Sequence, residues 1–313
     1  MIVLLLKILF FPGILFLFVF SMAAEYFDRK LYAKMQNRIG PPWFQPVADF
    51  IKLLAKELII PEHADRKIFQ ALPLVACSSV IIAYLYIPLW NKESIMSFNG
   101  DIIFVLYMLT IPTLTYSLAG WYSRSQYSLV GSMRVLTQLF SYEVPLFMAV
   151  LAPTILASSW SFTEVIGFYN ASGSLWLVNI IAFAVAIVTL QGKLEKVPFD
   201  IPEAETEIVA GSFTEYTGPL YAYFRLAMNM QTIAGASLVA AVFLPFGYGS
   251  FFLLNFVIYI IKVIFIIFLL AVIRTIFARL RTDQMLSFCW KYLAPIALIQ
   301  ILINVIIKAV VLR

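Results

Sequence analysis

Residues 251–273 read FFLLNFVIYIIKVIFIIFLLAVI, a run in which Lys262 is the only charged residue. Because an α-helix rises about 1.5 Å per residue, about 20 apolar residues cross the ~30 Å hydrocarbon core of a bilayer. Comparable apolar runs lie at about 2–24, 68–90, 101–121, 138–158, 174–194, 219–244, 251–273 and 291–311. Lipid offers no partner to the backbone of an isolated strand, so each run is expected to be a helix. The sequence predicts an all-α integral membrane protein with eight transmembrane helices in a single transmembrane domain, 1–313.

The composition agrees with this fold class and excludes a soluble domain. Of the 313 residues, 62% are hydrophobic and 12% are charged, which is too apolar for a soluble domain. The first run has no small-residue cleavage site before the charged stretch at 25–38, so it is expected to be retained rather than removed as a signal peptide. Two separate cysteines, Cys77 and Cys289, and the single His63 predict no iron–sulfur or zinc site in this chain. Nucleotide-binding glycine motifs are absent from the sequence.

Lysine and arginine are concentrated in alternate loops. The link after the first run holds eight of them, and the links at 122–137, 193–217 and 274–291 hold another eight. The opposite links, at 91–100, 159–173 and 245–250, hold only Lys92. Since positive charge marks cytoplasmic loops, both termini are predicted to lie outside.

A helical stripe of apolar residues follows the first run. Residues 42–58 place Phe44, Phe50 and Ile51 on one face, opposite charged positions that include Asp49 and Lys52. This pattern predicts an amphipathic helix at the cytoplasmic surface, acting at least as a membrane anchor.

Glu143 is the clearest carboxylate at membrane depth. It stands near the start of the 138–158 run, two residues before Pro145, which removes a backbone donor and opens room for water or side-chain partners. Ionisable groups in lipid are costly, so Glu143 is either part of an ion path or the partner of a neighbouring cation.

The acidic cytoplasmic loop, 193–217, gathers six carboxylates around Lys193 and Lys196. They are Glu195, Asp200, Glu203, Glu205, Glu207 and Glu215. Like charges raise one another's pKa values when they are partly buried, which would favour proton exchange near neutral pH. Spacing places Asp200, Glu203 and Glu207 on one helical face, although Asp200 and Glu203 also fit a capping box around Pro202.

Two cations lie inside apolar runs. Arg225 follows Tyr221 in the sixth run, and Lys262 is near the middle of the seventh, with apolar residues for about ten positions on either side. At that depth snorkelling to the surface is not expected for Lys262. Lys262 is predicted to belong to an ion path or to pair with a carboxylate of a neighbouring subunit.

Three segments resemble one family. Residues 25–61 read EYFDRKLYAKMQNRIGPPWFQPVADFIKLLAKELIIP, 119–145 read AGWYSRSQYSLVGSMRVLTQLFSYEVP, and 197–218 read VPFDIPEAETEIVAGSFTEYTG. They resemble the NADH dehydrogenase subunit 1 family of respiratory complex I, including its relatives in membrane-bound energy-converting hydrogenases. The likeness covers essentially the whole chain.

This resemblance implies a subunit at the junction of a peripheral redox arm and a membrane arm. It places Glu143, Glu203, Glu205, Glu207 and Glu215 in an ion path, and we expect Glu25 and Lys262 to belong to the same path. It places Arg38, Asp49, Lys52, Lys56 and Glu57 at a redox-arm interface, and we expect Asp200 and Arg225 to belong to the same interface. It implies no cofactor on this chain and no catalytic residue, with iron–sulfur clusters in hydrogenase-like peripheral subunits on the cytoplasmic side. Antiporter-like and small membrane subunits are the other expected partners, in a prokaryotic cytoplasmic membrane, and no nucleic acid is expected.

Departures from the complex I pattern refine the branch. The loop at 40–46 is shorter than expected, Lys193 and Lys196 replace a glutamate and an arginine, and Met228 and Asn229 replace a Glu-Tyr pair. These features resemble ferredoxin-dependent hydrogenases and sulfane reductases, which use no quinone. We therefore expect such a complex, pumping H⁺ or Na⁺. The alternative is the quinone-binding subunit of respiratory complex I, and a secondary transporter is disfavoured because no internal repeat is evident.

Overall fold

The computed structural model describes residues 2–202, 205–249 and 251–311, and these ranges contain helices and links but no strand. The α-helices are α1 (Ile2–Leu9), α2 (Ile14–Met35), α3 (Gln45–Leu54), α4 (Arg66–Tyr86), α5 (Asp101–Tyr122), α6 (Gln126–Ala157), α7 (Phe162–Ala171), α8 (Ile180–Lys193), α9 (Glu205–Ile208), α10 (Gly218–Phe243), α11 (Phe252–Ile276), α12 (Thr282–Phe288) and α13 (Ala294–Val311). Short 3₁₀ helices η1 (Leu175–Asn179) and η2 (Gly211–Phe213) and a π-helical turn, η3 (Cys289–Leu293), complete the described set. Eight helical segments of the described chain are long and apolar enough to cross a membrane. The predicted all-α membrane fold is confirmed.

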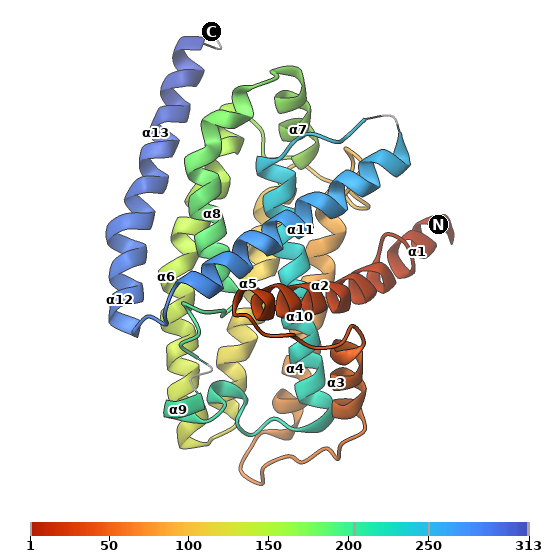
Figure 1. Ribbon diagram of the computed structural model, residues 1–313, viewed down its shortest axis with the longest axis vertical. Helices are drawn as coiled ribbons and strands as arrows, with labels where there is room; N and C mark the ends of the chain where they lie inside the picture. The colour runs from red at the N-terminus through yellow and green to blue at the C-terminus, as the bar shows by residue number, and fades with distance from the viewer. Residues whose placement is uncertain (1, 203–204, 250, 312–313) are drawn as a thin grey trace.

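Helix α10 forms the centre of the bundle. Every side chain from 230 to 243 is buried, and small residues such as Gly235 allow α8 to approach closely. Helices α4, α5, α6 and α8 run roughly along the long axis of the molecule, whereas α2 and α11 cross it obliquely (Figure 1). Helix α13 packs on α6 and α8 at the edge. Helices α3 and α9 lie at one end of the bundle, called here the α3 end, and α7 lies at the other (Figure 1).

The first apolar run is two helices, and its predicted bounds of 2–24 are wrong. The chain breaks between Leu9 and Ile14, because Pro12 lacks a backbone donor. The break requires glycine at position 13, where a Cβ would lie 1.8 Å from the carbonyl oxygen of Ile8. Beyond residue 24 the helix continues to Met35, through polar residues that favour helix and include the Glu25–Arg29 pair one turn apart. The charged residues 25–35 are therefore helical instead of forming a loop.

Two other helices extend past their predicted bounds of 138–158 and 291–311. Helix α6 begins at Gln126, and the last helical segment begins at Thr282. A count of apolar residues misses the first turns of these helices, because packing against other parts of the protein stabilises them and no lipid contact is needed. Helix α6, for example, packs on η2, α9 and α12. In α6, Pro145 and Pro153 lie within a continuous helix.

The amphipathic helix is shorter than its predicted range of 42–58. Helix α3 has proline in its first turn and ends at Leu54, and it packs on α2 and α10. Its apolar face is partly exposed at Val47, Ile51 and Leu54.

Candidate functional site

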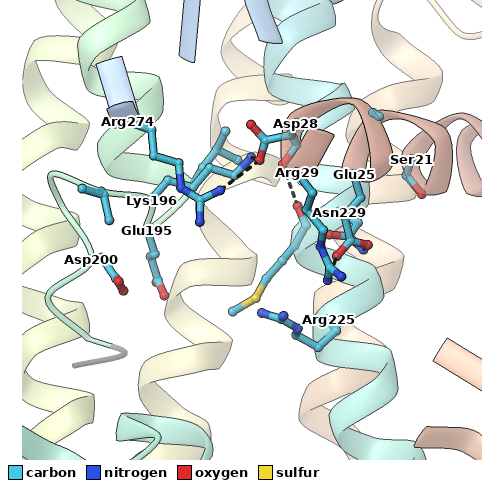
Figure 2. A pocket seen from close by; sticks show the side chains of 15 residues that line it. Ser21, Glu25, Asp28, Arg29, Glu195, Lys196, Asp200, Arg225, Asn229 and Arg274 are labelled. Atoms are coloured by element: carbon cyan, nitrogen blue, oxygen red, sulfur yellow. Dashed lines mark hydrogen bonds and ion pairs between the residues drawn. The ribbon is translucent and has the colours of Figure 1, made fainter. Parts of the chain in front are cut away.

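A charged cavity of about 170 Å³ lies between α2, α10, the end of α11 and the link after α8. Four carboxylates and four cations line it: Glu25, Asp28, Glu195, Asp200, Arg29, Lys196, Arg225 and Arg274. Figure 2 shows these side chains converging on one space from elements far apart in the sequence. The formal charges of these eight groups cancel, so the cavity concentrates ionisable groups without a large net field.

Asp28 connects three of the surrounding elements. Its side chain is 7% exposed, and its Oδ2 lies 2.9 Å from Lys196 Nζ and 3.3 Å from Arg274 Nη1 (Figure 2). Removing a buried carboxylate from water is costly unless cations and donors replace the water. The two ion pairs supply that compensation, and they hold the link after α8 against α2 and α11.

Glu25 organises the other side of the cavity. Asn229 of α10 and Arg29 of α2 both donate to its carboxylate. Arg29 also donates to Asp49 of α3, at 2.9 Å. The charged cavity is thus linked through one arginine to the amphipathic helix.

A buried ion pair joins α8 to α6 close to this cavity. Lys193, the last residue of α8, is 2% exposed, and its Nζ lies 3.0 Å and 3.1 Å from the two carboxylate oxygens of Glu143. The same Nζ lies 5.5 Å from the centre of the Tyr142 ring. The predicted apolar run 174–194 includes Lys193, and the helix does continue to this residue. The Lys193 cation lies at the C-terminal end of α8, where the helix dipole is negative and stabilises it.

The buried ion pair and the charged cavity are close to one another along the chain. Glu195 lines the cavity, is 7% exposed, and follows Lys193 by two residues. Gln138 of α6 fixes this turn by donating to the carbonyl oxygen of Gly192 at 2.7 Å. The buried lysine that pairs with Glu143 inside the bundle is therefore only two residues along the chain from a carboxylate at the cavity wall.

The acidic loop divides its charges between two places. Glu195 and Asp200 reach the charged cavity, whereas Glu207 faces Arg134 at 2.6 Å and Arg279 at 3.8 Å. The hydrogen bond and charge of Arg134, with the charge of Arg279, hold the pKa of Glu207 below its usual range. Glu215 is half-buried.

One predicted feature of this loop is wrong and two positions stay untested. Asp200 and Glu207 do not share a helical face, because the chain is not helical at Ile201 and Pro202 and α9 covers only Glu205–Ile208. Glu203 lies outside the described residues, and so does the side chain of Glu205.

The residues assigned to the redox-arm interface fall into two groups. Arg38, Lys52, Lys56 and Glu57 are exposed, and the last three lie in α3 or in the link that follows it. Asp49 is half-buried and accepts from Gln45 at 2.8 Å, while Asp200 and Arg225 line the charged cavity. The outer group is accessible to a partner, and the inner group is continuous with the cavity.

Lys262 lies apart from these carboxylates. It is 4% exposed, and its Nζ donates to the carbonyl oxygens of Leu244, at 2.6 Å, and Phe246. The rings of Phe246 and Tyr248 lie 4.6 Å from it. Lys262 thereby satisfies backbone oxygens at the end of α10 opposite to the cavity, where helix carbonyls lack partners.

Sequence reasoning missed Asp28, Arg274 and Arg29 as members of the site. The signal was present, because Glu25, Asp28 and Arg29 are spaced to share one face of a helix. It was hidden by the assumption that the helix ends with its apolar residues. Within the described ranges, no three His, Cys, Asp or Glu side chains come together in a group that could hold a metal ion.

Comparisons with known proteins identify relatives along nearly the whole chain. A family model described as NADH dehydrogenase matches residues 6–305. The H-subunit of NADH-quinone oxidoreductase from Carboxydothermus hydrogenoformans is 33% identical over 302 residues, covering 92% of this chain and 85% of the relative. The protein of the same name from Bacillus thuringiensis is 35% identical over 294 residues, covering 90% and 87%.

Among solved structures, a chain of the membrane-bound sulfane sulfur reductase, an archaeal respiratory membrane complex, superimposes with a TM-score of 0.85. It is 26% identical, and the match covers 96% of this chain and 98% of that one. The relatives are thus subunits of multi-subunit membrane complexes.

Proposed function

Since the chain belongs to the NADH dehydrogenase family and resembles a membrane component of NADH-quinone oxidoreductase throughout, we propose that it couples electron transfer in a peripheral arm to ion movement in the membrane. The complex would be a ferredoxin-dependent energy-converting hydrogenase or sulfane reductase, and the pumped ion H⁺ or Na⁺. This chain would stand at the junction of the two arms, with the α3 end facing the cytoplasm and both termini outside. The iron–sulfur clusters would belong to hydrogenase-like peripheral subunits, and antiporter-like subunits would continue the membrane arm.

The Lys193–Glu143 pair beside the charged cavity is the observation that carries this proposal. A purely structural anchor has no need of a buried ion pair, because apolar residues of similar volume are often as stabilising. Ionisable groups at membrane depth generally mark ion pathways. Here the pair is only two residues from Glu195 at the wall of the cavity.

The geometry suggests how the chain's own residues would move charge. When Glu143 takes up a proton, the Lys193 ammonium loses its counter-charge in a site that water barely reaches. A buried charge without a partner costs several kcal/mol, about 3–5 kcal/mol in measured cases. Lys193 would respond by releasing its own proton or by turning toward another carboxylate, such as Glu195. Electron arrival near the α3 end would bias this exchange through the charges that line the cavity.

Ion pumping by the purified complex in liposomes, with reduced ferredoxin as donor, tests the proposal. In Glu143→Gln we expect electron transfer to continue while the ion gradient collapses, because the amide neither takes up a proton nor carries a charge to pair with Lys193. Glu164→Gln, at a carboxylate in the short helix α7, is the matched control and should pump normally. Undiminished pumping in Glu143→Gln would show that the path runs elsewhere and that the chain chiefly anchors the peripheral arm.

A second candidate is the quinone-binding subunit of complex I, favoured by the names of the relatives at 33% and 35% identity. Both candidates share the ion path and differ in the electron acceptor. Lipid extracted from the purified complex should contain stoichiometric quinone only in the second case.

A further inference from the structure

Two adjoining hollows lie beside α6 and α12, apart from the charged cavity. The first, about 510 Å³, is walled by Leu129, Val130 and Met133 of α6 and Leu286 of α12. The second, about 340 Å³, is lined by three arginines, Arg134, Arg279 and Arg281, with Glu207 and Asp283. Arg134, Thr282 and Asp283 line both hollows, so an apolar space continues directly into a basic one. Both volumes lie within the range of small-molecule sites, about 300–1,000 Å³.

The basic hollow has more positive charge than its own carboxylates balance. Glu207 accepts from Arg134 at 2.6 Å and lies 3.8 Å from Arg279, yet its side chain is 52% exposed. With Asp283 included, the lining keeps a formal charge of +1. Planar guanidinium groups match the oxygens of phosphate better than a single lysine does. The chemistry therefore suits a phosphate group that shares these arginines with Glu207.

The apolar hollow is lined by exposed residues of two helical segments that are long enough to cross the membrane. Val130 is 47% exposed, Met133 54% and Leu286 43%, and all three belong to such segments. Exposed side chains of this kind would contact hydrocarbon in a bilayer. An anionic group beside a hydrocarbon chain at the boundary of the membrane is the arrangement found in a phospholipid.

We propose that the joined hollows bind one anionic phospholipid, with its phosphate at Arg279 and Arg281 beside Glu207 and an acyl chain between α6 and α12. Arg134 lies at the boundary between the two parts. The site is assigned independently of whether the chain conducts ions.

Binding would also reach the acidic loop. Arg279 donates to the carbonyl oxygen of Ile201 at 3.5 Å, and the backbone of Leu280 donates to that of Pro198 at 3.0 Å. The link between α11 and α12 thus holds the start of the acidic loop. A phosphate that draws Arg279 away from Glu207 changes how firmly α9 is tethered to this link.

The test measures lipid bound to the intact complex. Complex stripped of lipid by detergent is incubated with phosphatidylglycerol, and bound lipid is counted by native mass spectrometry. The double variant Arg279→Gln/Arg281→Gln should bind about tenfold more weakly, as expected when two charge-assisted contacts are lost. Glu207→Gln should bind more tightly than wild type, because it removes the competing carboxylate. Raising the salt concentration should weaken binding in the wild type more than in the double variant.

The matched control is Arg66→Gln/Lys67→Gln, which removes the same charge from exposed positions at the start of α4. It should bind phosphatidylglycerol like the wild type. If both double variants lost the same amount of lipid binding, the effect would come from the overall charge of the protein, and this result would overturn the site. Equal affinity for phosphatidylcholine, or full displacement of the lipid by inorganic phosphate, would overturn the assignment of an anionic phospholipid. If the arginine double variant does not assemble, unchanged binding in Glu207→Gln would overturn the proposal instead.

Discussion

Lys193 Nζ lies 3.0 Å from Oε2 of Glu143, and this contact ties the end of α8 to the interior of α6. The lysine is 2% exposed in its side chain and the glutamate 13%, so water has little access to either partner. Each charge is tolerated at this depth because the other is present. The pair is neutral as a whole and charged as soon as one proton is gained or lost.

A double-mutant cycle should show this coupling. Glu143→Gln and Lys193→Gln each leave one buried charge without its counter-ion, and we expect each to destabilise the assembly by about 3–5 kcal/mol. The double variant should be more stable than either single variant, because neither charge remains. Apparent melting temperatures and assembly yields of the purified complexes would measure the coupling between the two residues. Simple addition of the two single effects would show that the residues act independently.

The sequence predicted the class of fold well, and it predicted the site less completely. Apolar runs report which residues can face lipid, so eight spans emerged directly. They do not report where a helix ends when its last turns pack on protein, which is why Asp28 was placed in a loop. Ion pairs such as Lys193 with Glu143 depend on which helices are neighbours in space. A single sequence does not contain that information in its spacing.

Asp28→Asn tests the centre of the charged cavity. The substitution leaves Lys196 and Arg274 facing an uncharged amide and gives the lining a surplus positive charge. Hydrogen bonds to charged groups contribute about 1.5–3 kcal/mol to stability. Because both cations are partly exposed, we expect Asp28→Asn to lower the free energy of unfolding by about 2 kcal/mol. Hydrogen exchange should become faster at the backbone amides of residues 194–197 and 199–200, which these pairs hold in place. As a control, Glu62→Gln on the exposed link before α4 should leave that hydrogen exchange unchanged. Unchanged exchange in Asp28→Asn would show that the two ion pairs do not hold this link in place.

Lys262→Met tests the role of the cation in α11. Methionine keeps most of the volume but donates no hydrogen bond, so the carbonyl oxygens of Leu244 and Phe246 lose their partner. We expect a cost of about 1–3 kcal/mol in stability and faster hydrogen exchange at the backbone amides of residues 246–249. Lys308→Met, at a lysine that donates to Ile155 at the end of α6, is the matched control and should not affect that link.

Ion pumping by the same pair of variants addresses the ion path predicted for Lys262. A member of the path should lose pumping in Lys262→Met while Lys308→Met keeps it. Equal pumping in both variants would limit Lys262 to stabilising the end of α10.

Acid should release Glu207 from the arginines around it. Its pKa is held below the ordinary value of 4.5 by the hydrogen bond and charge of Arg134, with smaller contributions from Arg279 and Arg281. A carboxyl whose pKa is lower in the folded state stabilises that state above its unfolded pKa, and the contribution disappears as pH falls through the folded pKa. The tether between α9 and α6 should therefore be constant near neutrality and weaken only at pH values below 4.5.

Limited proteolysis of the acidic loop at a series of pH values, with an acid-stable protease, would follow this release. Cleavage in the wild type should rise at the acid end, whereas Glu207→Gln should be cleaved at nearly the same rate throughout, since it has no proton to gain at that position. Asp283→Asn, at an exposed carboxylate of α12, should follow the wild-type profile. Parallel profiles for wild type and Glu207→Gln would mean that other carboxylates control the loop, and the Arg134–Glu207 contact would then have no part in its acid response.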